Sequence, residues 1–166
     1  MSNLVYLSLG SNLGNREDHL RRAISRLAAH GRLLSASSFY ETEPVEVSDQ
    51  PWFLNCAAAL ETEEPPQQLM SSLLAIENEM CRKRIEKKGP RTIDIDILLY
   101  GNLSVNTPEL TVPHPAMTQR RFVLEPLAEI APEAEHPLRK KTVRELLKDL
   151  PAGQGVRKIK TGLKAE

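Results

Sequence analysis

The sequence predicts an α+β fold in which helices pack on one face of an antiparallel sheet. Stretches with strand-like alternation and stretches with helical spacing follow one another in the order strand, helix, strand, strand, helix, strand. The length of 166 residues, with 40% hydrophobic and 27% charged residues, fits one compact globular domain. This order of elements is typical of a ferredoxin-like sandwich. We therefore expect a single domain over residues 1–166, with its core at about 4–150.

The N-terminal half supplies the first strand and helix and then two further strands. Residues 4–10 alternate between apolar and polar as a strand does, and the turn "GSNLGN" follows them. Asn15 is a suitable N-cap for a helix with an apolar face. The stretches "LLSASSFYET" at 33–42 and "FLNCAAALET" at 53–62 predict the second and third strands, joined by a proline-bounded loop at 44–51.

The C-terminal half begins with a second helix. Pro65 and Pro66 suit its first turn, and apolar residues then recur at i, i+4, i+7 and i+11 over about twenty residues. The stretch "TIDIDILLY" at 92–100 predicts the fourth strand, and shorter helices are expected at 122–130 and in 142–150. Residues 151–166 have few apolar groups to bury, so we expect a mobile tail.

Charge and cysteine content exclude several classes of protein. The 22 basic residues balance the 22 acidic ones, so net charge indicates no polyanionic partner. The two cysteines, Cys56 and Cys81, have no metal-binding or disulfide-framework spacing, which favours a reducing cytoplasm. No apolar run approaches the roughly 18 to 20 residues of a membrane span. We expect a cytoplasmic protein that binds neither membrane nor nucleic acid.

Two aspartates interrupt the apolar strand in "GPRTIDIDILLYG". Because side chains of a strand alternate between its faces, Asp94 and Asp96 should share one face and the isoleucines the other. Two carboxylates about 6.5 to 7 Å apart can converge on one or two cations, and Mg²⁺ accepts such ligands together with phosphate oxygens. The alternative is an edge strand whose aspartates simply face water.

A basic segment precedes the aspartates. The stretch "CRKRIEKKGPR" contains six basic residues and the single acid Glu86, and guanidinium groups bind phosphate oxygens in a bidentate way. The carboxylates can bind a cation, and the neighbouring basic side chains can bind a polyanion. This combination favours a magnesium nucleoside triphosphate as the ligand. A solvated charged surface is the alternative, whereas nucleic acid is disfavoured because aromatic residues do not alternate with the basic ones.

Two further stretches contain groups that can bind phosphate. The loop "GSNLGN" lacks the Lys-Ser/Thr pair of a P-loop and the third glycine of a dinucleotide fingerprint, so a tight structural turn is the preferred interpretation. His114 lies between two prolines, shortly before Arg120 and Arg121. It is either a surface histidine or a donor to phosphate.

Five stretches of the sequence carry a resemblance to a known family: "SLGSNLGNR", "SSFYETEPV", "FLNCA", "GPRTIDIDILLYG" and "VPHPAMTQRRFVLEPLAEIAP". Together they resemble the 6-hydroxymethyl-7,8-dihydropterin pyrophosphokinase family of folate biosynthesis. The resemblance covers about Leu4 to Pro132, and its most specific part is Lys87 to Leu98, where a basic residue, Gly-Pro-Arg and Asp-Ile-Asp stand at the family's spacing. It implies a ferredoxin-like enzyme that transfers diphosphate from ATP to the pterin hydroxymethyl group and releases AMP.

The resemblance also implies roles for individual residues. Asp94 and Asp96 would hold two Mg²⁺ ions, with Asp94 near the attacking hydroxyl. Catalytic roles would fall to these two aspartates with Arg82 and Arg91. The nucleotide would be bound by Glu77, Arg84, Arg91, Ile97, Thr111, His114 and Arg120. The pterin would stack between Phe53 and Phe122, with Thr42, Asn55, Asp94 and backbone groups near Val45 around it.

We therefore expect a monomeric pterin pyrophosphokinase whose partners are ATP and 6-hydroxymethyl-7,8-dihydropterin. The loops at 10–16, 44–51 and 82–90 would close over the substrates and exclude water. Two alternatives stay open at this point. A nucleotidyltransferase can also use paired carboxylates on a strand, and a ligand-binding or RNA-binding module can use the same kind of scaffold without any need for metal ligands.

Overall fold

The computed structural model describes residues 2–42, 52–80, 92–151 and 155–159. Its main sheet has the spatial order β10-β3-β4-β1-β5, and β2 also pairs with β4. Every pairing in this sheet is antiparallel, which confirms the predicted ferredoxin-like class. The strands are β1 (Asn3–Ser11), β2 (Arg32–Ala36), β3 (Phe39–Thr42), β4 (Phe53–Thr62), β5 (Asp94–Tyr100) and β10 (Val156–Ile159).

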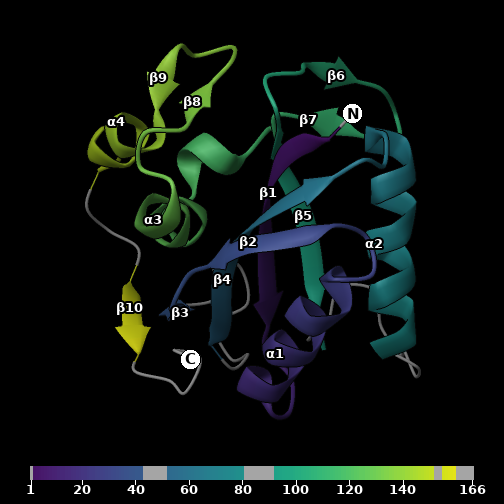
Figure 1. Ribbon diagram of the computed structural model, residues 1–166. Coiled ribbons are helices and arrows are strands. Elements are labelled where there is room, and N and C mark those ends of the chain that lie inside the picture. The colour runs from purple at the N-terminus through teal and green to yellow at the C-terminus, as the bar shows by residue number, and fades with distance from the viewer. Residues whose placement is uncertain (1, 43–51, 81–91, 152–154, 160–166) are drawn as a thin grey trace.

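The helices α1 (Arg16–Leu27) and α2 (Pro66–Met80) cover one face of the sheet (Figure 1). Their apolar side chains, among them Leu20 and Leu73, are buried against the inward-facing residues of β1, β4 and β5. This is the helical layer that the sequence predicts. The Asn15 side chain caps α1 as expected, because its Oδ1 accepts a hydrogen bond from the Asp18 amide at 3.1 Å.

A second helical layer, which the prediction did not include, lies on the opposite face (Figure 1). It consists of α3 (Arg121–Ile130) and α4 (Val143–Lys148), whose apolar side chains pack with Ala57 of β4 and with Leu98 and Leu99 of β5. A β-bulge makes this possible, since Leu7 pairs with Ile97 but Tyr6 pairs with Leu99. The extra residue lets β5 turn two successive leucines toward α3.

The stretch 33–42, predicted as one strand, forms the two strands β2 and β3. The break falls at two serines whose side chains and amides bond outside the ladder. The Ser37 hydroxyl donates to the Ser38 carbonyl at 2.7 Å and accepts from the Ala57 amide at 2.9 Å. The Ser38 amide donates to the Glu129 carboxylate at 3.1 Å, and the Tyr40 hydroxyl donates to the same carboxylate at 2.7 Å. These bonds attach α3 to β3.

The smaller elements follow β5 along the chain. They are β6 (Val105–Asn106), β7 (Thr111–Val112), the 3-10 helix η1 (Met117–Gln119), β8 (Glu135–His136) and β9 (Lys141–Thr142). Thr142 begins the last helix through a capping box with Glu145. Within the stretch expected to be a mobile tail, β10 pairs with β3, a strand that the sequence did not predict. In the part of the chain that is described, no helix has the length and apolar character needed to cross a bilayer.

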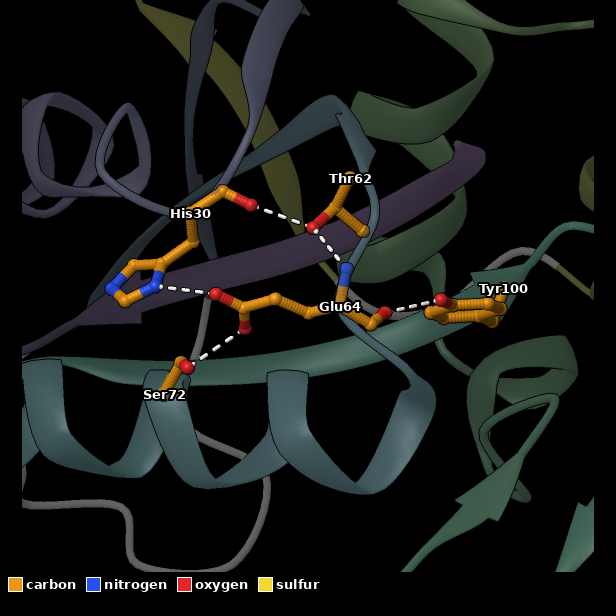
Figure 2. Close-up of polar contacts among 5 residues, drawn as sticks. All are labelled: His30, Thr62, Glu64, Ser72 and Tyr100. Carbon is orange, nitrogen blue, oxygen red and sulfur yellow. Dashed lines mark hydrogen bonds and ion pairs between the residues drawn. The ribbon is translucent and has the colours of Figure 1, made fainter. Parts of the chain in front are cut away.

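A polar network joins the elements at the end of the sheet where β4 finishes (Figure 2). Glu64 accepts from the Ser72 hydroxyl at 2.8 Å, and its other carboxylate oxygen lies 2.9 Å from His30 Nδ1. The Thr62 hydroxyl donates to the His30 carbonyl at 2.6 Å, and the Tyr100 hydroxyl donates to the Glu64 carbonyl. The network therefore links the turn after α1 with β4, α2 and β5 and holds this end of the sheet together.

Candidate active site

Asp94 and Asp96 lie half-buried on β5, on the sheet face opposite α1 and α2. The adjacent isoleucines, Ile93, Ile95 and Ile97, are buried in the core on the other face, so the predicted alternation is confirmed. Within the described ranges, no three or more His, Cys, Asp or Glu side chains gather as a metal site. A carboxylate pair suits Mg²⁺, which takes one or two carboxylates and fills its remaining positions with water and phosphate oxygens.

Gly10 lies between the carboxylate strand and β4. It pairs with Asp94 on one side and with Asn55 on the other. A Cβ atom at Gly10 would lie only 2.6 Å from Asn55 Oδ1 and 3.5 Å from the Phe53 ring. Asn55 in turn donates from Nδ2 to Thr42 Oγ1 at 2.8 Å, and both residues are buried. The missing side chain of Gly10 thus makes room for the Asn55 amide.

No local sequence signal predicts this role for Gly10. The preferred interpretation of "GSNLGN" as a tight turn is confirmed at Gly14, whose φ of 67° lies in the left-handed region that glycine tolerates. Gly10 instead belongs to β1 and has no positive φ. Its importance comes from its strand partners, and strand register cannot be read from a single stretch of sequence.

His114 lies close to the carboxylate strand. Its amide donates to the Leu98 carbonyl at 3.0 Å, and its Nδ1 accepts from the Ala116 amide at 3.2 Å. Burial lowers the pKa of His114, the Arg120 guanidinium lowers it further, and the Asp94 carboxylate opposes both. With Nδ1 accepting, the neutral ring carries its hydrogen on Nε2, which can then donate to an anion.

Arg120 and Phe122 extend this group to the start of α3. The Arg120 guanidinium lies 5.5 Å from the centroid of the Phe122 ring, a cation–π arrangement. Phe122 is half-buried and packs against the apolar cluster under α3. The structure therefore brings Asp94, His114, Arg120 and Phe122 into one neighbourhood.

The other predicted nucleotide residues lie along the open edge of β5 and beyond it. Glu77 of α2 accepts a hydrogen bond from the Ile95 amide at 2.7 Å, so its carboxylate lies against the open edge of β5. Ile97 is 3% exposed and its side chain belongs to the core, so a contact with a ligand would fall to its backbone, two residues beyond Ile95 on the same edge. Thr111 is half-buried at the start of β7.

Several predicted residues fall outside the described part of the chain. They are Val45, Arg82, Arg84 and Arg91. Two of the three loops expected to close over the substrates, 44–51 and 82–90, also lie outside the described residues.

A polar hollow of about 570 Å³ lies at the other end of the sheet, away from Asp94. Its lining side chains bond one another: Ser2 donates to Glu61 at 3.1 Å, Arg32 lies 4.0 Å from the same carboxylate, and His30 lies against Glu64. We assign no function to it. The groups with metal-binding and phosphate-binding chemistry are at the opposite end.

The fold and this neighbourhood define a class. A ferredoxin-like α+β protein with a carboxylate pair on a strand, beside a histidine and an arginine, has the groups that phosphoryl-type transfer uses for positioning and charge neutralisation.

The family model for 7,8-dihydro-6-hydroxymethylpterin-pyrophosphokinase (HPPK) matches residues 6–132. A 2-amino-4-hydroxy-6-hydroxymethyldihydropteridine pyrophosphokinase of Bacillus subtilis is 46% identical over 137 residues, which is 81% of this chain and 82% of that protein. The protein of the same name from Haemophilus influenzae is 41% identical, over 87% of this chain and 91% of its own length. This chain belongs to the HPPK family, as the sequence motifs predict.

Longer proteins contain the same unit. A folic acid synthesis protein of Dictyostelium discoideum is 39% identical over 95% of this chain, which spans only 24% of that protein. The crystal structure of wild-type HPPK-DHPS from Plasmodium falciparum with pteroate has a TM-score of 0.70 over 89% of this chain and 42% of its own, at 15% identity. At that identity the likeness concerns the fold alone.

Proposed function

We propose that this chain transfers diphosphate from ATP to the hydroxymethyl group of 6-hydroxymethyl-7,8-dihydropterin and releases AMP. The observation that carries the proposal is the pair Asp94 and Asp96 on one face of β5, next to His114 and Arg120, in a member of the HPPK family. A cytoplasmic location and a monomeric state are part of the same proposal.

Two Mg²⁺ ions, held by Asp94 and Asp96, form the metal part of the proposal. The carboxylates are half-buried, and they lie on the same face as the residues that would surround the substrates. Bound Mg²⁺ would neutralise the triphosphate and lower the pKa of the pterin hydroxyl.

The phosphates would lie between β5 and the segment that carries His114 and Arg120. The neutral His114 can donate from Nε2, and Arg120 supplies a permanent positive charge. The arginines at 82, 84 and 91 would contribute further charge from the other side. Glu77, Thr111 and the backbone of Ile97 would contact the nucleoside along the edge of β5.

The pterin would lie between the rings of Phe53 and Phe122, since flat aromatic rings favour stacking on a flat heterocycle. Asn55 and Thr42 lie beside Phe53 and already bond each other at 2.8 Å, so this polar edge is arranged before the substrate arrives. Backbone groups near Val45 would complete the edge.

The chemistry is an in-line displacement at the β-phosphorus of ATP. The hydroxyl oxygen forms the new bond to phosphorus, the hydroxyl proton is released, and the bond from that phosphorus to the oxygen shared with the α-phosphate breaks. The residues of this chain orient the two substrates and neutralise charge. Asp94, nearest to the hydroxyl in this arrangement, would also orient it.

Replacing Asp96 with Asn tests the proposal. Turnover should fall by about a hundredfold or more, because charge placement is the main source of rate enhancement in such sites, while pterin affinity should change only a few-fold. The matched control is Asp149→Asn, which removes the ion pair between Lys141 of β9 and Asp149 at the C-terminal end of α4, away from Asp96. Steady-state turnover and calorimetric binding give the two readouts, and nearly normal turnover by D96N would contradict the assignment.

A further inference from the structure

Four side chains connect the C-terminal strand to the strand ends beside the proposed pterin site. The Glu41 carboxylate of β3 accepts from Arg16 at 2.8 Å and from Arg157 of β10. Arg16 also donates to the Trp52 carbonyl at 2.8 Å, and the Arg157 guanidinium lies 5.6 Å from the centroid of the Trp52 ring. We call Arg16, Glu41, Trp52 and Arg157 the Glu41 cluster.

The cluster lies directly behind residues proposed to bind the pterin. Glu41 immediately precedes Thr42, and Trp52 immediately precedes Phe53, while Thr42 and Phe53 pair with each other across β3 and β4. Because side chains alternate along a strand, Glu41 points to the face opposite Thr42. A shift of Glu41 or Trp52 therefore moves the backbone from which Thr42 and Phe53 project.

The Glu41 carboxylate is largely shielded from water, so its charge interacts more strongly with the two arginines than it would at an exposed site. The Glu41 side chain is 17% exposed, whereas the Arg157 side chain is 67% exposed. Hydrogen bonds from both arginines hold the pKa of Glu41 below its usual range. A single exposed ion pair contributes little to the stability of a protein. Here, however, the Glu41 carboxylate joins two guanidinium groups, and that of Arg157 also lies over the Trp52 indole ring.

The family model ends at residue 132, so Arg157 and β10 lie beyond the part of the chain that it matches. The C-terminal strand nevertheless pairs with β3 along Tyr40, Glu41 and Thr42. This pairing places the chain's C-terminal strand at the edge of the sheet nearest the proposed pterin contacts.

We propose that β10, through the Glu41 cluster, positions the ends of β3 and β4 for pterin binding. Glu41 and Arg157 are positioning residues in this proposal, and neither touches the substrate. The inference rests on the proposed function, because it concerns the affinity of the proposed site for pterin.

The full-length chain allows a test with two independent readouts. Trp52 is the only tryptophan, so the intrinsic fluorescence at excitation wavelengths selective for tryptophan reports on the cluster itself. Arg157→Ala should change the Trp52 emission without ligand and raise the KM for pterin about three- to tenfold, while kcat and the KM for ATP stay within about twofold. Glu41→Gln should have the larger effect on KM, because it removes the charge that both arginines share.

Two further variants separate positioning from general loss of structure. Arg157→Lys keeps the charge opposite Glu41 and should recover part of the pterin affinity. Asp149→Asn removes a distant ion pair and should change neither the emission nor either KM. A changed emission with an unchanged pterin KM, or a parallel loss in kcat and both KM values, would overturn the proposal. An inactive wild-type protein would overturn the proposed function as well, whereas active wild type with unaffected variants would overturn the positioning role alone.

Discussion

Replacing Gly10 with Ala should destabilise the protein through one identified contact. The added Cβ would lie 2.6 Å from Asn55 Oδ1, closer than non-bonded carbon and oxygen atoms approach, whereas its 3.5 Å distance to the Phe53 ring is ordinary contact. The Asn55 side chain must move, and its 2.8 Å bond to the buried Thr42 hydroxyl is then lost or strained. Gly10 has no positive φ, so backbone strain does not contribute.

The magnitude follows from these contacts. The added Cβ is accommodated either by overpacking, which costs about 1 to 3 kcal/mol, or by displacement of Asn55, which leaves a buried polar group unpaired and costs about 1 to 3 kcal/mol. The lower entropy of the unfolded Ala-containing chain offsets about 0.4 to 1 kcal/mol of this. We expect a net loss of about 2 kcal/mol in the free energy of unfolding, and a pterin affinity lower by about tenfold or more because Asn55 is displaced.

A double-mutant cycle identifies the cause. Urea unfolding would be measured for G10A, N55A and the G10A/N55A double variant. In the N55A background the new Cβ no longer meets Oδ1, so G10A should cost nearly nothing there, giving a coupling of about 1 to 3 kcal/mol. Equal costs of G10A in both backgrounds would show that the contact between the new Cβ and Asn55 Oδ1 is not the cause of the lost stability.

Three other predictions can be measured by the same unfolding experiments. Glu77→Ala removes the acceptor of the Ile95 amide at 2.7 Å and should cost about 1 to 2 kcal/mol; no loss of stability would mean that water replaces the carboxylate. Tyr40→Phe removes the 2.7 Å bond to Glu129 and should lower stability by about 1 kcal/mol with an unchanged urea m-value. Burial lowers the pKa of His136, so as the pH falls the unfolded chain binds a proton before the folded protein does, and stability should decrease below about pH 6.5. In His136→Asn this decrease should be smaller. An identical pH profile for the variant and the wild type would contradict the prediction.

Local signals in the sequence predict much of the fold. Alternation placed Ile95 in the core and Asp94 on the other face, and the structure confirms both. The cap at Asn15 and the helical spacing of Leu69 and Leu73 indicated α1 and α2 for equally local reasons. The two aspartates also stood out locally, since charged residues within an otherwise apolar strand need a reason.

Features that depend on distant partners were not predictable in this way. The break at Ser37 depends on the Ala57 amide and on Glu129 of α3, which are far away in the sequence. The bulge at Leu98, which turns β5 toward α3, is defined only by the register with β1. Strand β10 was missed because its four residues carry little apolar signal and gain their order from pairing with β3.

Product analysis distinguishes the proposed diphosphate transfer from its alternatives in one experiment. The purified protein would be incubated with ATP, Mg²⁺ and 6-hydroxymethyl-7,8-dihydropterin, and the nucleotide and pterin products would be separated and quantified. We expect AMP and pterin diphosphate in equal amounts. ADP would indicate transfer of a single phosphate, pyrophosphate would indicate a nucleotidyltransferase, and no product from folded protein would indicate a binding module. Each of these results would contradict the proposed diphosphate transfer.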